Sequence, residues 1–310
     1  LSLKEGYSLM LSDTEGEVKV SLYKRSKLVD SQVLQPPADY IYEGSIANQN
    51  ATLIAVAVKA NVKLEPESYY TIKGIFQVSE ETEPIEPGMK YGRMQIASVS
   101  ENGIEMINSD VISLSKGQDI ELMDGFRIKT SSINASYDRL YICRNAIESD
   151  LSEIRSEIAT GDFSWTPQNF AGFFYDVDED LGAESLTTTL YDNKLEEPNG
   201  VAYSTTAQQK EFEFKDWGHY NTLAFLGEGC VASYGEDSLL SRSSVESNLL
   251  SSEKLGRVLM DRGEPRIIEN GANLTLEEEL EARIYVDQSC SKALIELYGG
   301  GELIDRDYID

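Results

Sequence analysis

The 310-residue chain carries 54 acidic and 27 basic side chains, which gives a formal net charge of −27. A surface this acidic repels nucleic acids and anionic lipid headgroups, because phosphate binding needs clusters of Lys and Arg. Hydrophobic residues at 41% argue against disorder, and no run of about 18 apolar residues predicts a membrane-spanning helix. The length fits two domains of about 150 residues, each able to bury its own core.

The first part of the chain, residues 1–145, has the pattern of short β-strands. Residues 17–24 alternate polar and apolar side chains with a period of two, as a half-buried antiparallel strand does. Asn102-Gly103 and Asp124-Gly125 predict hairpin turns, because these residue types tolerate a positive φ. About ten such strands predict a sandwich or a barrel, and we interpret this part as an antiparallel β-sandwich. The chain opens directly on a strand pattern, which is typical of a trimmed fragment.

The middle segment, residues 146–160, is polar and acidic, with apolar side chains at helical spacing. It fits either a linker helix or a charged strand, and we interpret it as a linker between two domains. Residues 161–310 then predict a second antiparallel β-sandwich, with one short helix near 252–261. Ser251 or Ser252 can cap that helix, and Leu255 and Leu259 lie on one of its faces. The predicted fold class is therefore all-β, with two sandwich domains in tandem.

An internal repeat links the two ends of the chain. Residues 1–5, Leu-Ser-Leu-Lys-Glu, return as Leu-Thr-Leu-Glu-Glu at residues 274–278, an offset of 273. Leu22-Tyr23 returns as Leu297-Tyr298, an offset of 275. The difference of two residues falls in a hairpin turn, where insertions are tolerated. We therefore expect residues 1–30 and 274–305 to form the same β-hairpin.

Cysteine and histidine are too few for a zinc site. The three cysteines, Cys143, Cys230 and Cys290, are not in a Cys-x-x-Cys pair, and we interpret them as small core residues or free thiols. His219 is the chain's one histidine, and no recognisable nucleophile accompanies it. No catalytic residue and no cofactor are predicted.

Two short motifs partly match the patterns of known ligand sites. Residues 227–232 match the loose dinucleotide pattern Gly-x-Gly-x-x-Ala, but the acidic sequence after them is a poor helix start. Asp176, Asp178 and Asp180 alternate as in a calcium loop, although the glycine comes one position late. Calcium binding is therefore a weak prediction beside an acidic surface turn.

Three sequons, at Asn50, Asn134 and Asn273, are candidates for N-glycosylation if the protein is secreted. The aromatic run from Trp165 to Tyr175 fits either a sandwich core or a platform for stacking on sugars.

Several stretches resemble the S-layer duplication-domain proteins of methanogenic archaea. The resemblance rests on residues 165–182, which run from Trp165 through Phe173-Phe174-Tyr175-Asp176 to Gly182, and on residues 3–9, 27–31 and 74–79. It covers nearly the whole chain in two out-of-phase halves, as the repeat also requires. It implies export to the cell surface, tandem β-sandwiches, N-linked glycans and assembly with further copies into a two-dimensional lattice with charged pores.

Together these features predict a structural, non-enzymatic subunit of an acidic surface barrier, with itself, glycans and divalent cations as partners. The alternative is a cell-surface adhesin or carbohydrate-binding module that uses the aromatic residues 165–175. An enzyme would require a pocket with two paired carboxylates, and the sequence singles out no such pair.

Overall fold

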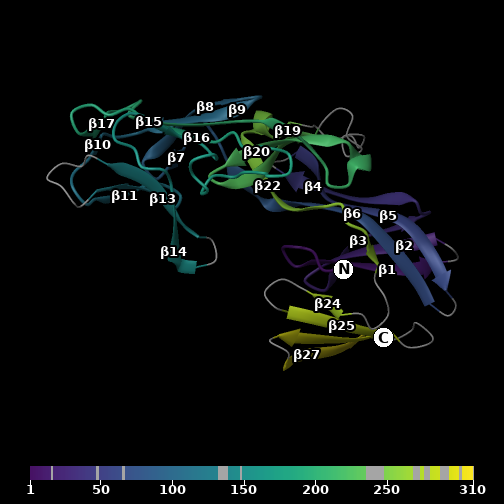
Figure 1. Ribbon diagram of the computed structural model, residues 1–310. Coiled ribbons are helices and arrows are strands. Elements are labelled where there is room, and N and C mark those ends of the chain that lie inside the picture. Colours follow the sequence, from purple (N-terminus) through teal and green to yellow (C-terminus); the bar gives the residue numbers. More distant parts are fainter. Residues whose placement is uncertain are drawn as a thin grey trace. The chain divides into compact units, whose positions relative to one another are not determined.

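In the computed structural model, the described residues are 1–14, 17–46, 49–64, 67–131, 139–146, 149–234, 248–267, 273–275, 280–286, 293–299 and 302–309. Most of them belong to antiparallel β-strands (Figure 1). Contacts divide the chain into two compact units. Unit 1 comprises residues 1–43, 52–77 and 259–310, and unit 2 comprises residues 44–51 and 78–258.

Unit 1 begins with a three-stranded meander, β1 (Tyr7–Thr14), β2 (Glu17–Lys24) and β3 (Lys27–Leu34). Alternate residues of β2 point to one face, where Val18 and Leu22 are fully buried, because successive side chains of a strand lie on opposite sides. Each buried side chain of this size contributes about 1.5–3 kcal/mol. The predicted strand at residues 17–24 is confirmed.

Three longer strands of this region are β4 (Ala38–Ile46), β5 (Gln49–Leu64) and β6 (Glu67–Pro84). The short strand β23 (Arg266–Ile267) pairs with β6. Residues 51–58 of β5 are all buried, which shows that both faces of this strand are covered. Such a strand reads as a continuous apolar run and not as an alternation.

Polar side chains join the meander of unit 1 to β4 and β6. The Gln77 amide accepts the Lys4 N–H at 2.8 Å and donates to the Lys4 carbonyl at 3.0 Å. The Tyr40 hydroxyl donates to the Asp30 carboxylate at 2.8 Å. Gln77 and Tyr40 are both fully buried, so each of these bonds replaces a bond to water that the buried group has lost.

A second meander lies near the C-terminus. It consists of β24 (Asn273–Thr275), β25 (Leu280–Val286), β26 (Ala293–Gly299) and β27 (Glu302–Ile309), which pair in chain order. It repeats the register of β1 to β3. In both meanders a leucine pairs with an aspartate, and after a bulge the following tyrosine pairs with a leucine. The pairs are Leu22↔Asp30 and Tyr23↔Leu28 in the first meander, and Leu297↔Asp305 and Tyr298↔Leu303 in the second.

The beginning of the repeat matches as well. Ser2 bridges to Ser8 in the first meander, and Thr275 pairs with Glu281 in the second. Thr275 and Glu281 lie 273 residues after Ser2 and Ser8, which is the predicted offset. A bulge changes the register at one position only, so its recurrence after Leu22 and after Leu297 marks equivalent backbones. The predicted internal repeat is confirmed for the described residues.

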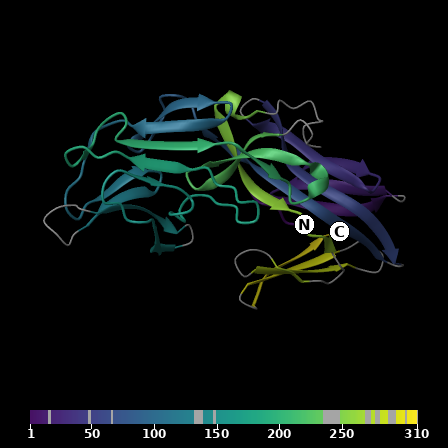
Figure 2. The same ribbon diagram turned by 45° about the horizontal axis from the view of Figure 1, so that its top comes forward.

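Unit 2 contains a six-stranded antiparallel sheet in the order β15-β16-β18-β9-β8-β7. Figure 2 shows the blue strands β8 and β9 beside the green strand β18. The strands are β7 (Lys90–Tyr91), β8 (Met94–Ser100), β9 (Gly103–Asn108), β15 (Phe163–Trp165), β16 (Ser185–Thr188) and β18 (Val201–Thr206). The Asn102-Gly103 turn joins β8 to β9, as predicted.

The other strands of unit 2 form a four-stranded sheet, a short pair and a separate meander of unit 2. The sheet is β11 (Asp119–Met123), β12 (Phe126–Thr130), β13 (Leu140–Ala146) and β14 (Ser149–Arg155). The pair is β10 (Ile112–Ser113) with β17 (Lys194–Leu195). The meander runs through β19 (Gln208–Glu211), β20 (His219–Phe225), β21 (Glu228–Tyr234) and β22 (Lys254–Arg262).

The predicted linker and the predicted domain boundary differ from the structure. Residues 149–155 form β14, which pairs with β13 through Cys143↔Arg155. Residues 146–160 therefore contain a charged strand, and their interpretation as a linker is wrong. The two units are also interleaved in sequence, since strands β4, β5, β6 and β22 each contribute residues to both. Pairing between segments far apart in the chain, such as β9 with β18, leaves no trace in local composition.

The predicted helix near 252–261 is wrong. Residues 254–262 form strand β22, and only Leu250–Ser252 makes a 3-10 turn before it. The hydroxyls of Ser251 and Ser252 donate to the carbonyls of Asn248 and Leu249, just before that turn, and cap no helix. Pairing of Cys230 with Arg257 recruits the segment into a sheet, and such tertiary pairing overrides local periodicity. Among the described residues, no helix has the length and apolar character needed to cross a bilayer.

Candidate functional site

The aromatic and acidic loop, residues 165–184, joins β15 to β16 and is the strongest candidate site of unit 2. Three of its rings, Trp165, Phe170 and Phe173, are buried. The Trp165 indole N–H donates to the Glu157 carbonyl at 2.8 Å, and the rings of Phe170 and Phe173 meet edge to face at 5.0 Å. These rings therefore fill the core, and Trp165 offers no platform on which a sugar could stack.

Glu184, near the end of the loop, is the residue that holds the loop to the sheet. It is 1% exposed, and its carboxylate accepts three hydrogen bonds. The donors are the Tyr203 hydroxyl at 2.8 Å, the Gly227 N–H at 2.8 Å and the Phe174 N–H at 2.7 Å. Burial raises the pKa of Glu184, while these hydrogen bonds act in the opposite direction. No feature of the sequence distinguished this carboxylate from the other acidic residues.

Arg144 of β13 ties the loop to the β20–β21 turn. Its guanidinium donates to the Gly172 carbonyl at 3.0 Å and to the Leu226 carbonyl at 3.1 Å, and it lies 4.9 Å above the centre of the Phe126 ring. The arginine therefore satisfies two loop carbonyls and also makes a cation–π contact.

Gly227 of the dinucleotide-like pattern lies in this same hairpin turn, and Gly229 lies in strand β21 directly after it. Gly227 has φ +82 and packs so closely on Arg144 that a Cβ would lie 1.9 Å from Nη1. Strand β21 follows the turn at Glu228, so no helix N-terminus is available for a pyrophosphate. The pattern Gly227-x-Gly229 is explained by the turn and its close packing.

Two aspartates of the calcium-like pattern, Asp176 and Asp180, have different side-chain partners. Asp176 forms an ion pair with Lys210 and accepts the N–H groups of Asp178 at 3.1 Å and Glu179 at 3.3 Å. The Tyr175 hydroxyl donates to Asp180. In the part of the chain that the structure describes, no group of three such side chains is arranged for a metal. Calcium binding at Asp176, Asp178 and Asp180 stays a prediction.

Lys210 fixes the conformation of this acidic turn. Its side chain is 9% exposed and also lies 3.6 Å from the Glu179 carboxylate. Burial acts to raise the pKa of Asp176, but Lys210 and the two N–H groups outweigh it, so the pKa is lowered. The turn therefore remains charged and rigid while Val177, at its tip, is 79% exposed.

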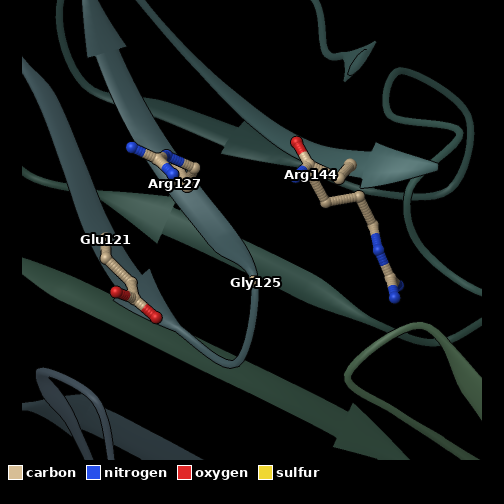
Figure 3. Close-up of a pocket in the computed structure, with 5 residues that line it drawn as sticks. Glu121, Gly125, Arg127 and Arg144 are labelled. Carbon is tan, nitrogen blue, oxygen red and sulfur yellow. The ribbon is translucent and has the colours of Figure 1, made fainter. Parts of the chain in front are cut away.

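One shallow pocket lies on the β11–β14 sheet, with a volume of about 160 Å³. It is lined by Glu121, Gly125, Arg127, Arg144 and Asn145, and Figure 3 shows Arg144 pointing away from Arg127. Arg127 is already paired with Asp119 at 2.7 Å, and Arg144 is held by the loop carbonyls. The arrangement presents no converging pair of groups for catalysis.

The other sequence candidates are cysteines, a histidine and one sequon. Cys143 and Cys230 are buried free thiols, and burial raises the pKa of Cys143 to about 11. His219 begins β20 and pairs in register with Glu211. Cys290 and Asn134 are outside the described residues.

The two remaining sequons lie in strands. Asn50 is in β5, two residues before the fully buried Thr52. Asn273 is in β24, in register with Arg283. Glycosylation at these positions stays a prediction.

Comparison with known proteins shows one consistent relationship. The family model described as S-layer protein matches residues 1–132 and 154–310. The chain is also similar over its full length to proteins called major S-layer protein. It is 27% identical over 326 residues to that of Methanosarcina mazei, 23% over 325 residues to that of Methanosarcina barkeri, and 23% over 329 residues to that of Methanosarcina acetivorans. It covers 46–47% of each of these proteins, so it spans about half of their length.

Proposed function

We propose, from the premise that this chain belongs to the S-layer protein family, that it is a structural subunit of a cell-surface lattice. The observation that carries the proposal is the match of the family model to nearly the whole chain, together with relatives named as major S-layer proteins. The rigid β-sheet units and the buried aromatic loop support a load-bearing, non-catalytic role. Further copies of the chain are the principal partner.

The net charge supports a barrier function in this proposal. With 54 acidic and 27 basic residues, the gaps between assembled copies would be lined mainly by carboxylates. At physiological ionic strength a charge is screened beyond about 8 Å, so such carboxylates repel anionic solutes only in narrow openings. The lattice would therefore select by charge as well as by size.

Imaging of native cell envelopes tests the lattice. Cryo-electron tomography with an antibody to this chain should place the label at regular spacing over a two-dimensional surface array. An antibody to a cytoplasmic protein of the same cells serves as the control. Label confined to the cell interior, or scattered without the periodicity of the array, would contradict the proposal.

A permeation measurement tests the barrier separately. Isolated envelopes should retard an anionic dye more than a neutral dye of the same size at low salt. The difference should vanish in about 1 M salt, where the Debye length falls to about 3 Å. Equal permeation of both dyes at low salt would remove the charge barrier from the proposal and leave the lattice intact.

Glycans and divalent cations complete the proposed set of partners. N-linked glycans at Asn50, Asn134 or Asn273 would be detected as mass additions on peptides of the native protein. Divalent cations would bridge carboxylates of neighbouring copies, because hard cations prefer oxygen ligands. Dispersal of the array by a chelator, reversed by calcium but not by sodium at equal ionic strength, tests this second partner.

A further inference from the structure

The hairpin between β2 and β3 is basic, although the protein as a whole is strongly acidic. Lys24, Arg25 and Lys27 lie within four residues of a chain whose net charge is −27. The turn is built by positive φ angles at Arg25 and Ser26. Arg25 and Lys27 are exposed, and neither has an ion pair with any residue that the structure describes.

The repeat shows that the hairpin does not need these cations. In the second meander the same register and the same bulge are built, yet residues 299–302 read Gly-Gly-Gly-Glu. The basic residues therefore do not serve the folding of the hairpin itself. Exposed like charges held together cost free energy unless an opposite charge approaches, which points to an acidic partner.

An apolar stripe continues from this basic turn along β3. Leu28 and Val33 are each 51% exposed, and Val29 is 38% exposed. Among the described strands β3 pairs with β2 alone, so it is an edge strand. Exposed apolar side chains on an edge strand are a template for association with another chain. The basic turn and the stripe together define the basic edge, residues 24–33.

The acidic turn, residues 175–180, has the complementary chemistry. Val177 is its apolar tip, with 79% exposure, and Tyr175 is 38% exposed. Asp178 and Asp180 are exposed beside them, while Asp176 and Lys210 hold the backbone in place. A rigid turn of this kind loses little conformational entropy on binding.

We propose that the basic edge of one copy binds the acidic turn of a second copy. Arg25 and Lys27 would face Asp178 and its neighbours, and Val177 would pack on Leu28 and Val29. The contact joins two different surfaces, so each copy keeps one basic edge and one acidic turn available. Such a heterologous contact propagates from copy to copy. The inference rests on the proposed lattice function and names the surfaces that build it.

Charge reversal in trans tests the pairing. One variant of the chain carries Arg25→Glu and Lys27→Glu, and a second carries Asp178→Lys. Self-association is measured by sedimentation at low salt, with circular dichroism to establish that each variant is folded. Each variant alone should associate at least about 10-fold more weakly than the wild type, and the loss should shrink in high salt. The control Glu197→Lys changes the charge of another exposed loop by the same amount as Asp178→Lys does and should associate as the wild type does.

An equimolar mixture of the two reversed variants is the decisive sample. Association should recover in the mixture, because the reversed edge of the first variant then meets the reversed turn (Asp178→Lys) of the second. The unchanged edge of the second variant likewise meets the unchanged acidic turn of the first. Folded variants that stay dissociated when mixed would overturn the inference. Weak association of the Arg25→Glu, Lys27→Glu variant with normal association of Asp178→Lys would also overturn it, and binding of the wild type to anionic glycan or vesicles would then identify the occupant. If the wild type itself shows no association, the lattice function fails and not this pairing alone.

Discussion

Leu22 of β2 and Leu297 of β26 occupy equivalent positions in two meanders of one chain. Each pairs with an aspartate of the next strand, Asp30 or Asp305, and in each case a bulge follows immediately. The shared bulge is strong evidence of duplication, because hydrophobic alternation alone would fix neither its position nor its presence. The relationship also makes one meander an internal control for the other.

Replacement of Gln77 should loosen the start of the chain. The buried amide satisfies both the N–H and the carbonyl of Lys4, and Gln77→Ala leaves two backbone groups without their partner. Each loss costs about 1–3 kcal/mol. Hydrogen exchange should show faster exchange at Lys4 while β20 and β21 of unit 2 keep their protection. Gln77→Glu should also loosen this region, because a carboxylate cannot donate to the Lys4 carbonyl, and unchanged exchange in both variants would contradict the argument.

Removal of the Glu184 carboxylate should destabilise unit 2. Glu184→Ala leaves the Tyr203 hydroxyl and the N–H groups of Phe174 and Gly227 without an acceptor, which we expect to cost at least about 2 kcal/mol in urea unfolding. Glu101→Ala, in an exposed turn, is the control and should change stability by less than about 0.5 kcal/mol. An equal effect of the two substitutions would show that the loop does not depend on Glu184.

The raised pKa of Glu184 predicts how the stability of the protein depends on pH. The pKa of Glu184 is raised above its ordinary value of 4.5, so the folded state binds its proton more tightly than the unfolded state does. Stability from this group is therefore greatest below the unfolded pKa and falls as the pH rises through the folded pKa. Glu184→Gln should lose this component. Its stability relative to the wild type should improve as the pH rises from about 4.5 towards neutrality, as measured by unfolding at each pH.

The ion pair of Lys210 with Asp176 should give stability the opposite dependence on pH. The pKa of Asp176 lies below its ordinary value of 3.8 when folded, so the pair stabilises above that pH and is lost as the pH falls through the folded pKa. Lys210→Met leaves a mostly buried carboxylate without its cation and should cost about 2–3 kcal/mol at pH 7. Lys215→Met is the control, since the Lys215 side chain is 81% exposed and such surface pairs contribute about 0–1 kcal/mol. A loss that does not shrink between pH 7 and pH 2.5 would argue against the ion pair as the cause.

The strands and the repeat were predictable because their signals are local. The alternation of residues 17–24 indicates one buried face of a strand. Asn102-Gly103 and Asp124-Gly125 indicate turns that need a positive φ or a small residue. The error at residues 252–261 has the opposite origin. Leu255 and Leu259 suit a helix as well as a strand, and only pairing of Arg257 with Cys230 decides between them.

The candidate site was predictable in part. The aromatic and acidic loop was identified by its residues, but Glu184 was missed because a buried carboxylate and an exposed one look alike in sequence. Lys210 was missed for a related reason. It lies 34 residues from Asp176, and only the fold of β19 brings it to the acidic turn. Long-range contacts of this kind carry no periodicity.

Two hairpin glycines of unit 2 separate backbone strain from crowding. Gly125 and Gly227 have nearly equal φ angles of +79 and +82, but a Cβ at Gly125 would meet nothing within 4 Å. A Cβ at Gly227 would lie 1.9 Å from Arg144 Nη1 and 2.6 Å from the Gly172 carbonyl. Gly125→Ala should therefore cost about 1 kcal/mol, from the left-handed backbone alone. Gly227→Ala should cost at least about 2 kcal/mol more, because Arg144 must give up its loop carbonyls.

A double-mutant cycle locates the cause of that difference. In an Arg144→Ala background the largest clash at Gly227 is gone, so Gly227→Ala should cost clearly less than it does in the wild type. The free energies of unfolding in urea, measured for the four proteins of the cycle, give the coupling between the two residues. A coupling near zero would mean that Arg144 is free to move aside, and the hairpin turn would then depend on Gly227 for its φ angle and not for the space that it leaves to the guanidinium.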